Sequence, residues 1–442
     1  SDRFEIRASD GLGALDLAVT PDLATCPDCR AEVLASRGRR AGYAFTNCTA
    51  CGPRFSILQD LPYDRPATTM AAFTMCSSCG AEYDDPEDRR FHAQPNACPA
   101  CGPTLSWTAA DGTCPEGDPL QLAVAAIRSG RIIAVKGLGG FHLMCDAGSE
   151  SAVAALRDRK GRPSKPLAVM VRDLDSARQV ADLSPREAEV LESAAAPIVL
   201  VRWAVSGQGV RRYGAGYSAR HSGECGAGPS AGAPRPVLAP NVAPGHDRIG
   251  LFLPYTPLHH LMLAELDRPV VATSGNQSEE PICTDNTEAL ERLAGIADGF
   301  LLHDRPIERP VDDSVVDVRR GHAVSVRRSR GFAPFPLRLP FSVPPMIATG
   351  GHMKVAVGLA QGGSAWLGPH IGDLDTLEGR QAFDRSVRDL LRLYRLSPEI
   401  VAHDLHPDYP TSEWARSGTR SRFPETTRRI AVQHHHAHLA AL

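Results

Sequence analysis

The sequence lacks the features of a membrane or secreted protein. Its 442 residues contain no apolar run near the roughly 18 residues of a membrane span. The opening stretch, SDRFEIRASDGLGALDL, has neither the basic nor the apolar region of a signal peptide. The formal net charge is only -3, so no global positive charge favours nucleic acid or an anionic membrane. We therefore expect a cytoplasmic protein with no nucleic acid and no membrane among its partners.

Cysteine, by contrast, is abundant, with 12 residues. A chain of 442 residues exceeds the roughly 100 to 200 residues of a typical single domain, so several domains with their own cores are expected. Such a chain does not need disulfides for its stability in a reducing compartment. Metal ligation or catalysis is therefore the better interpretation of the cysteines.

Eight cysteines form two copies of one zinc-binding pattern within residues 9–110. In each copy 18 residues separate two CxxC pairs, and the second copy follows at an offset of 50 positions. Two CxxC turns supply four thiolates to a tetrahedral ion, so we expect two structural Zn²⁺ sites, and the fourfold repetition argues against a redox CxxC. The repeat favours sequential over interleaved pairing, and it leaves His92 as a surplus histidine. The predicted ligands are Cys26, Cys29, Cys48, Cys51, Cys76, Cys79, Cys98 and Cys101.

An alternation of helix and strand patterns begins near residue 117. Short β-branched runs at 131–137, 166–171, 196–201 and 268–275 predict strands, with helical patterns between them. One α/β domain is therefore expected at 115–335. A Gly-, Ala-, Ser- and Pro-rich stretch at 205–240 predicts a surface insertion, and the proline-rich residues 332–345 predict a linker before a further domain at 346–442.

Three segments of the α/β domain suit an anion site. In VKGLGGFHLMCDA, the turn from Gly137 to Gly140 lets backbone N–H groups approach a phosphate. The basic segment LRDRKGRPSKPLAVMV supplies cations, and VATSGNQSEEPI offers the polar side chains of Ser274 and Asn276. Taken singly, each feature has a plainer explanation as a turn or a solvated helix face.

The last segment, VQHHHAHLAAL, carries a metal-binding pattern. His434 and His438 are four residues apart, so on a helix both rings lie on one face and reach one ion. The preceding residues include the motifs ATGGHMK and GPHIGDLDT. A histidine-rich helix without a metal is the alternative interpretation.

Four motifs in this order, YAFTNCTACGPRFSI, DRRFHAQPNACPACGP, the α/β block and GGHMK to VQHHHAH, resemble the HypF family of NiFe-hydrogenase maturation proteins. The resemblance implies a multidomain α/β fold with a duplicated four-cysteine zinc-finger module and a YrdC-like domain. It further implies a remnant of an acylphosphatase-like domain at residues 1–8 and the first part of an ASKHA-like domain at 346–442.

The same resemblance implies roles for individual residues. It makes the YrdC-like domain an ATP and carbamoyl-adenylate pocket with Mg²⁺, in which Asp312 and Asp313 position metal or cations or else cap a turn. It makes His434 and His438 ligands of iron or zinc, with His352, Lys354, His370 and Asp373 near a nucleotide. The implied pocket residues are Lys160, Arg162 and Lys165 as catalytic groups and Lys136, Gly137, Gly139, His142, Ser274, Asn276 and Arg328 as nucleotide contacts.

The reaction implied by the family starts from carbamoyl phosphate and ATP and proceeds through carbamoyl-adenylate. The acceptor is the C-terminal cysteine of a HypE-type maturation protein. Two alternatives use similar modules: an antibiotic O-carbamoyltransferase, which the duplicated cysteine unit disfavours, and a threonylcarbamoyl-adenylate synthase, for which the near-neutral charge gives no support. A non-catalytic zinc scaffold is the alternative from another class, and it predicts no dependence on ATP.

Overall fold

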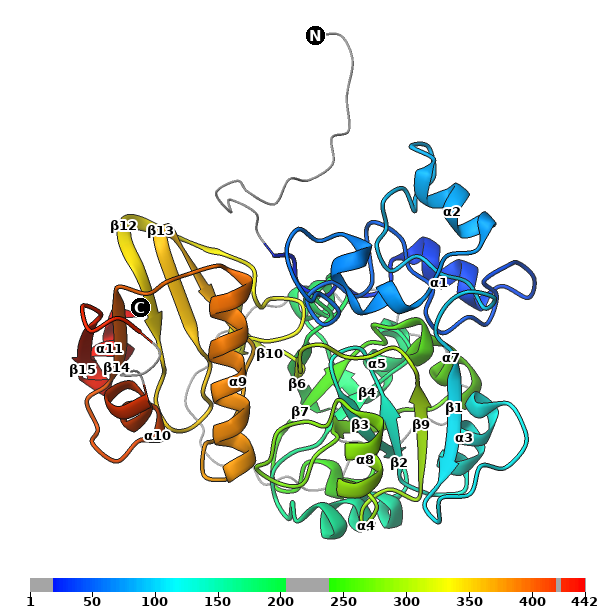
Figure 1. The fold of residues 1–442 in the computed structure, drawn as a ribbon. Helices are drawn as coiled ribbons and strands as arrows, with labels where there is room; N and C mark the ends of the chain where they lie inside the picture. Colours follow the sequence, from blue (N-terminus) through cyan, green and yellow to red (C-terminus); the bar gives the residue numbers. More distant parts are fainter. Residues whose placement is uncertain (1–18, 204–237, 419–422, 442) are drawn as a thin grey trace, which may run out of the picture.

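The structure, a computed structural model, describes residues 19–203, 238–418 and 423–441. The expected remnant at residues 1–8 and nearly all of the expected insertion at 205–240 lie outside the described residues. Figure 1 shows a cysteine-rich module (blue), a central α/β domain (cyan to yellow-green) and a smaller α/β unit (yellow to red). This arrangement confirms a multidomain α/β fold. None of the described helices combines the length and apolar character needed to cross a membrane.

The cysteine-rich module has little regular secondary structure, and its two repeats fold alike. In each repeat a CxxC cysteine, Cys26 or Cys76, stands at the N-cap of a short helix. The first turn of that helix carries the second cysteine, Cys29 or Cys79, into a fully buried position. The helices and 3₁₀ turns are α1 (Pro27–Leu34), η1 (Arg65–Ala67), η2 (Thr69–Ala72) and α2 (Ser77–Asp84).

The central domain is built on one mixed sheet of eleven strands. Its order is β1-β9-β2-β3-β8-β4-β7-β6-β10-β11, and β5 pairs with β6. The four strands predicted near 133, 168, 198 and 271 all lie in this sheet. The edge strand β1 directly follows the second zinc repeat, so the module is continuous with the sheet. The strands are β1 (Leu105–Ala109), β2 (Ile133–Lys136), β3 (Phe141–Asp146), β4 (Ala168–Met170), β5 (Ala181–Asp182), β6 (Ile198–Trp203), β7 (Arg248–Phe252), β8 (Val270–Ser274), β9 (Gly299–His303), β10 (Val315–Arg319) and β11 (His322–Arg327).

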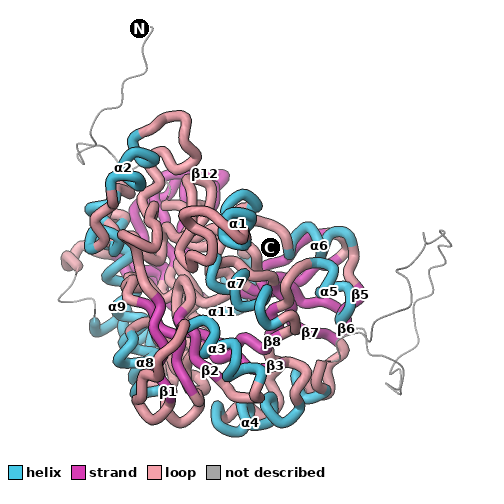
Figure 2. Tube along the Cα trace, turned by 90° about the vertical axis from the view of Figure 1, so that its right-hand side faces the viewer, coloured by secondary structure: helices cyan, strands magenta, loops and turns pink. Residues whose placement is uncertain are grey.

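Helices cover this sheet, and several begin at a side-chain cap that the sequence supplies. Asp118, Ser149 and Thr256 each accept a hydrogen bond from a backbone N–H in the first turn of a helix. Figure 2 shows α1 of the zinc module next to α7 of the central domain, where the two parts meet. The central helices are α3 (Pro119–Arg128), α4 (Glu150–Lys160), α5 (Leu174–Val180), α6 (Pro185–Leu191), η3 (Pro240–Val242), α7 (Pro257–Leu266) and α8 (Asn286–Arg292).

Two apolar cores belong to the central domain, and one of them continues into the zinc module. Tyr43, Phe45 and Met70 of the module pack in the same cluster as Ile133 and Val135 of β2. Burial of this shared apolar surface fixes the module against the domain. Residues at the edge of the module therefore help to shape the central site.

The last unit is a four-stranded sheet of order β13-β12-β14-β15 with a long helix against it. Its core includes Val387 and Leu390 of that helix and also Phe55 and Leu58 of the zinc module. The last unit therefore packs directly against the zinc module, which also packs against the central domain. The elements are β12 (Leu337–Ala348), β13 (Gly358–Leu367), α9 (Leu377–Leu393), β14 (Ile400–Asp404), α10 (Pro410–Glu413), η4 (Trp414–Gly418), β15 (Arg428–Val432) and α11 (His434–Ala440).

Candidate functional site

The eight predicted zinc ligands gather into two clusters of four. One contains Cys26, Cys29, Cys48 and Cys51 and the other contains Cys76, Cys79, Cys98 and Cys101, so the arrangement is sequential. Neighbouring sulfur atoms such as those of Cys48 and Cys51 lie 3.6 to 3.8 Å apart. A tetrahedron with Zn–S bonds of about 2.3 Å has edges of about 3.8 Å. Both clusters therefore fit a structural Zn²⁺ ion.

The two zinc repeats exchange charged side chains across their interface. Arg40 of the first repeat donates to Glu82 of the second at 2.5 Å, and Arg90 of the second pairs with Glu32 of the first. The offset of 50 residues relates the two pairs, so the duplication in sequence becomes an approximate symmetry in space. Arg40 and Arg90 are both buried, which makes each pair part of the module's core.

Lys160 is the centre of the candidate anion site. It ends α4, and its Nζ donates to the Ser274 carbonyl at 2.7 Å, the Asn276 carbonyl at 2.5 Å and Asn276 Oδ1 at 2.6 Å. Burial and the nearby Arg162 lower the pKa of Lys160 to about 7. Ser274 Oγ donates to Asn276 Oδ1 at 2.7 Å. The structure thus joins Lys160, Ser274 and Asn276, although Lys160 lies more than a hundred residues from the other two in the sequence.

Further cations surround this lysine and reach the last domain. Arg162 donates to the Pro166 carbonyl at 2.8 Å, its Nε has no hydrogen-bond partner among the described residues, and burial together with Arg327 lowers its pKa. Burial and the same Arg327 lower the pKa of His370 to about 4. Asp312, which is ion-paired with Arg327, acts on the pKa of His370 in the opposite direction, so charges of the central domain reach His370 of the last unit.

Two predicted site residues lie away from this centre. Lys165 is largely exposed and pairs with Glu279 at 3.8 Å, which places it at the rim. Arg328 donates to the carbonyls of Phe332 and Phe335, both at 2.9 Å. The arginine whose charge acts on Arg162 is instead Arg327, the neighbour of Arg328 and the last residue of β11.

The glycine-rich turn serves packing and internal hydrogen bonds. The Gly137 N–H donates to the Gly140 carbonyl at 2.9 Å. A Cβ on Gly139 would lie 2.5 Å from the Val311 carbonyl oxygen, so only glycine fits there. Lys136 lies in another microenvironment from Lys160, since the charges that affect its pKa are Arg305, Asp285 and Asp304.

His142 belongs to a buried network behind the turn. Its Nε2 lies 3.1 Å from Asp313 Oδ2 and 3.4 Å from the Tyr255 hydroxyl. Arg330 donates to Asp313 Oδ1 at 2.8 Å and covers the Tyr255 ring. The nearby cations, chiefly Arg330, hold the pKa of Asp313 well below its usual range despite its burial. Asp312 and Asp313 therefore both pair with cations, Asp312 with Arg327 and Asp313 with Arg330.

In the last unit the two predicted histidine ligands converge. His434 Nε2 and His438 Nε2 lie 3.2 Å apart, a separation at which both can bind one ion at about 2.1 Å. Asp404 Oδ2 lies 2.6 Å from His434 Nδ1 and so orients the ring. The donor set of two imidazoles fits iron or zinc.

The other predicted residues of this unit lie at or beside the turn between β12 and β13, next to the histidine pair: a Cβ on Gly351 would lie 3.5 Å from His434 Cε1. The backbone N–H of Lys354 donates to Asp373 Oδ1 at 2.7 Å. His352 Nε2 lies 3.1 Å from Asp375, and its ring stacks on Tyr409. These contacts order the turn between β12 and β13 beside the loop that carries His370.

Three family models match the chain in the order of its structural parts. The HypF finger matches residues 25–58 and 75–108. The Sua5/YciO/YrdC model, described as telomere recombination, matches 125–215 and 230–329. The HypF Kae1-like domain matches 342–442.

Whole-chain relatives agree with these models. The carbamoyltransferase HypF of Rhodobacter capsulatus is 49% identical over 99% of this chain and 54% of its own length. The Synechocystis carbamoyltransferase HypF is 44% identical over 99% of this chain and 53% of its own. A full-length HypF in a phosphate- and nucleotide-bound form superposes with a TM-score of 0.84 at 42% identity, over 96% of this chain and 51% of that one. The chain belongs to the HypF family.

Membership in the HypF family confirms the resemblance drawn from the four sequence motifs. The HypF structure of T. kodakarensis gives the same result, with a TM-score of 0.86 at 37% identity over 97% of this chain and 52% of that one. The chain spans about half the length of the curated relatives that it matches. Its fold is thus established at the level of the HypF family.

Three groups at these sites, the half-buried Arg327 and the buried His303 and Arg305, escaped the sequence analysis. Arg327 ends β11 directly before Arg328, and no local pattern separates the two arginines, because β11 is exposed along nearly all of its length. His303 and Arg305 lie at and just beyond the end of β9, and the end of a buried strand is a common place for functional groups in α/β folds. Their positions in LLHDRP could have been singled out on that ground.

Proposed function

We propose that this chain carries the adenylate-forming part of a HypF-type carbamoyltransferase of NiFe-hydrogenase maturation. The observation that supports this proposal most strongly is Lys160, an ammonium 3% exposed that bridges Ser274 and Asn276 with Arg162 and Arg327 beside it. Such a concentration of one buried and two half-buried cations suits the phosphates of ATP. The nucleotide-bound form of a full-length HypF relative also supports it.

The proposed reaction joins carbamate, derived from carbamoyl phosphate, to ATP. A carbamate oxygen attacks the α-phosphorus, the bond to the β-phosphate oxygen breaks, and pyrophosphate leaves with its electron pair. Charge accumulates on the phosphoryl oxygens in the transition state, and preorganised cations lower its energy by several kcal/mol. Lys160 and Arg162 supply that charge, and Lys165 guides phosphates at the rim. Mg²⁺ bound to the phosphates would neutralise further charge.

The second proposed step transfers the carbamoyl group to a thiol. The sulfur of the C-terminal cysteine of a HypE-type partner attacks the carbonyl carbon, the bond to AMP breaks, and the thiol proton is released. The influence of Arg327 on the pKa of His370 supports this step, because it indicates that the last unit lies near the cations of the central site. A short path protects a hydrolysable adenylate from water.

Isotope exchange between pyrophosphate and ATP tests the proposal in the full-length protein. We expect exchange that requires carbamoyl phosphate and does not respond to threonine. Exchange that requires threonine would instead indicate a threonylcarbamoyl-adenylate synthase. Absence of exchange with either compound would support the zinc-scaffold alternative and contradict the proposal.

A further inference from the structure

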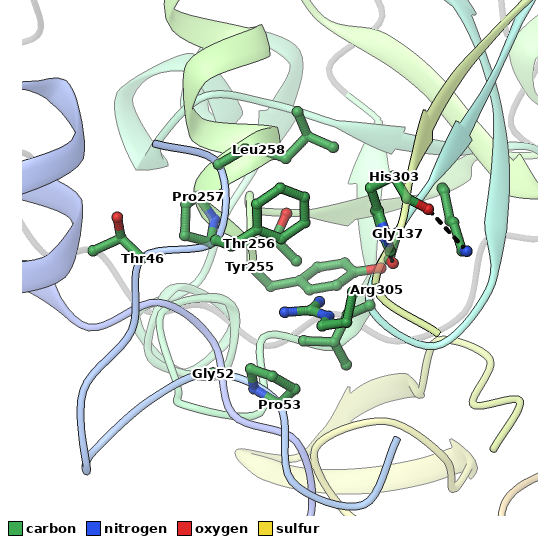
Figure 3. Close-up of a pocket in the computed structure, with 14 residues that line it drawn as sticks. Thr46, Gly52, Pro53, Gly137, Tyr255, Thr256, Pro257, Leu258, His303 and Arg305 are labelled. Carbon is green, nitrogen blue, oxygen red and sulfur yellow. Dashed lines mark hydrogen bonds between the residues drawn. The ribbon is translucent and has the colours of Figure 1, made fainter. Parts of the chain in front are cut away.

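A small cavity lies at the seam between the zinc module and the central domain. Phe45, Thr46 and Pro53 of the module bound it on one side, and Lys136 and Arg305 bound it on the other. The space open to water-sized molecules measures about 20 Å³, which is far too small for a nucleotide. Figure 3 shows the lining residues drawn from both parts of the chain. Any ligand of this cavity is therefore a few atoms in size.

Arg305 is an unusual cation for such a position. It is 5% exposed, and its Nε has no hydrogen-bond partner among the residues that the structure describes. The guanidinium lies over the Phe45 ring, 5.2 Å from its centre, which gives it only a weak partner. Burial lowers the pKa of Arg305 to about 10. A buried guanidinium is costly unless an anion and hydrogen bonds compensate it.

The carboxylates near Arg305 do not compensate it fully. Asp22 and Asp304 favour its charged form, but among the described residues neither forms an ion pair with it, and Asp22 Oδ2 has no hydrogen-bond partner. Asp22 Oδ1 accepts from the backbone N–H groups of Arg54 and Ser56, and Asp304 accepts from Thr104 at 2.8 and 3.0 Å. Within the described chain, Arg305 takes part in no ion pair. Its charge remains directed at the cavity that it lines.

Lys136 adds a second cation on the same side of the cavity. Its Nζ donates to the His303 carbonyl at 3.1 Å, drawn as a dashed line in Figure 3, and this carbonyl is the acceptor that the structure gives it. An ammonium has three N–H donors, so capacity remains for an anion. Burial and the nearby Arg305 lower the pKa of Lys136 to about 8, although the smaller effects of Asp285 and Asp304 act in the opposite direction.

We propose that Lys136 and Arg305 form a binding site for one small planar oxyanion of the carbonate class, separate from the nucleotide site at Lys160. A guanidinium presents a planar fork of donors that matches a carboxylate-type group of two oxygens. A tetrahedral anion such as sulfate has a larger cross-section and suits this narrow cavity less well. The site lies where the zinc module closes over the domain, so the anion would also fasten the two parts together.

Bicarbonate and carbamate share this chemistry, and the inference holds for either. The choice of carbamate as the physiological occupant rests on the proposed function. Binding of bicarbonate can be measured without ATP, so a failure of the anion site and a failure of adenylate formation are separate results.

The test is calorimetric titration of the folded chain with bicarbonate, supported by its thermal unfolding. Sodium chloride and sodium sulfate at matched ionic strength are the reference salts. We expect bicarbonate to bind and to raise the unfolding temperature above both references. Arg305→Met keeps the side chain's bulk without its charge and should weaken binding by about tenfold or more. Arg186→Met, at an exposed position of α6, is the matched control and should bind as the unaltered chain does.

Two outcomes would overturn the inference. One is a bicarbonate effect no larger than that of chloride in the unaltered chain, which would indicate a cavity filled by water. The other is equal bicarbonate affinity in Arg305→Met and Arg186→Met, which would place binding elsewhere. If Arg305→Met does not fold, Lys136→Met takes its place, with the same loss expected.

Discussion

Arg39 and Arg89 occupy equivalent positions in the two cysteine repeats, and each donates a hydrogen bond to a cysteine of the other repeat. Arg39 Nη1 lies 3.1 Å from Cys79 Sγ, and Arg89 Nη1 lies 3.0 Å from Cys29 Sγ. Four thiolates give a zinc site two net negative charges, so each guanidinium also offsets charge on the opposite cluster. The two metal sites are therefore coupled through their outer contacts.

Substitution of Arg39 by methionine should accelerate zinc release from the second cluster. Loss of an outer contact of this kind weakens metal binding by about 10- to 100-fold. Release to a chromogenic chelator measures the rate, and Arg37→Met, an exposed arginine of the same loop, is the control. Arg89→Met should produce the mirror effect on the first cluster. Equal zinc-release rates in Arg39→Met and Arg37→Met would show that the hydrogen bond from Arg39 to Cys79 does not slow zinc release.

Nucleotide binding should take up a proton at Lys160. Its pKa of about 7 in the free protein means that the amine is mostly neutral at about pH 8.5, whereas bound phosphates favour the ammonium. Proton uptake on nucleotide binding should thus occur above about pH 7. It should vanish toward about pH 5.5, where Lys160 is already charged in the free protein. Calorimetry of ATP binding in buffers with different ionisation enthalpies measures it.

Two variants separate Lys160 from other sources of that proton. Lys160→Met should abolish the uptake, whereas Lys165→Met, which removes the exposed lysine at the rim, should retain it. Unchanged uptake in Lys160→Met would assign the proton to another group.

Arg309 should stabilise the packing of the central domain against α9 and the zinc module. It is buried after β9, donates to Asp389 of α9 at 2.8 Å and also contacts the Leu58 carbonyl of the zinc module, so it joins three parts. Arg309→Met leaves Asp389 without this partner and should lower the free energy of unfolding by about 3 kcal/mol. Arg388→Met removes an exposed ion pair of the same helix and should cost less than about 0.5 kcal/mol. Urea unfolding distinguishes them, and equal midpoints would refute the assignment.

The histidine pair should depend on Asp404. Its carboxylate holds His434 in the orientation that directs Nε2 toward His438. Asp404→Asn should therefore weaken binding of Co²⁺, a spectroscopic substitute for zinc, by about tenfold or more. Asp408→Asn, an exposed acid nearby, is the control. If both variants bind Co²⁺ alike, Asp404 has no positioning role.

Local spacing made part of this structure predictable. The CxxC turns and their repeat at 50 residues determine the ligand clusters, because each pair binds within one turn of chain. The central strands were visible as β-branched runs that β2, β4, β6 and β8 now contain. The multidomain α/β class followed from these local patterns together.

Contacts between distant segments explain the rest. Lys160 was chosen with Ser274 and Asn276, but the three acceptors of its ammonium depend on how α4 meets the end of β8. Arg328 follows the last residue of β11, and the contacts that distinguish it from Arg327 are made to distant segments. Arg305 follows a predictable strand end, but its contact with Phe45 arises only when the zinc module packs against the domain.

Formation of carbamoyl-adenylate by this chain tests the central claim most directly. The chain is mixed with ATP, Mg²⁺ and carbamate, freshly formed from bicarbonate and ammonia, and the products are analysed by mass spectrometry. We predict a product with the mass of carbamoyl-adenylate, lost when Lys160→Ala and Arg162→Ala are combined and retained in Arg186→Met. Undiminished product in the double variant, or none from the unaltered chain while it binds ATP, would contradict the account.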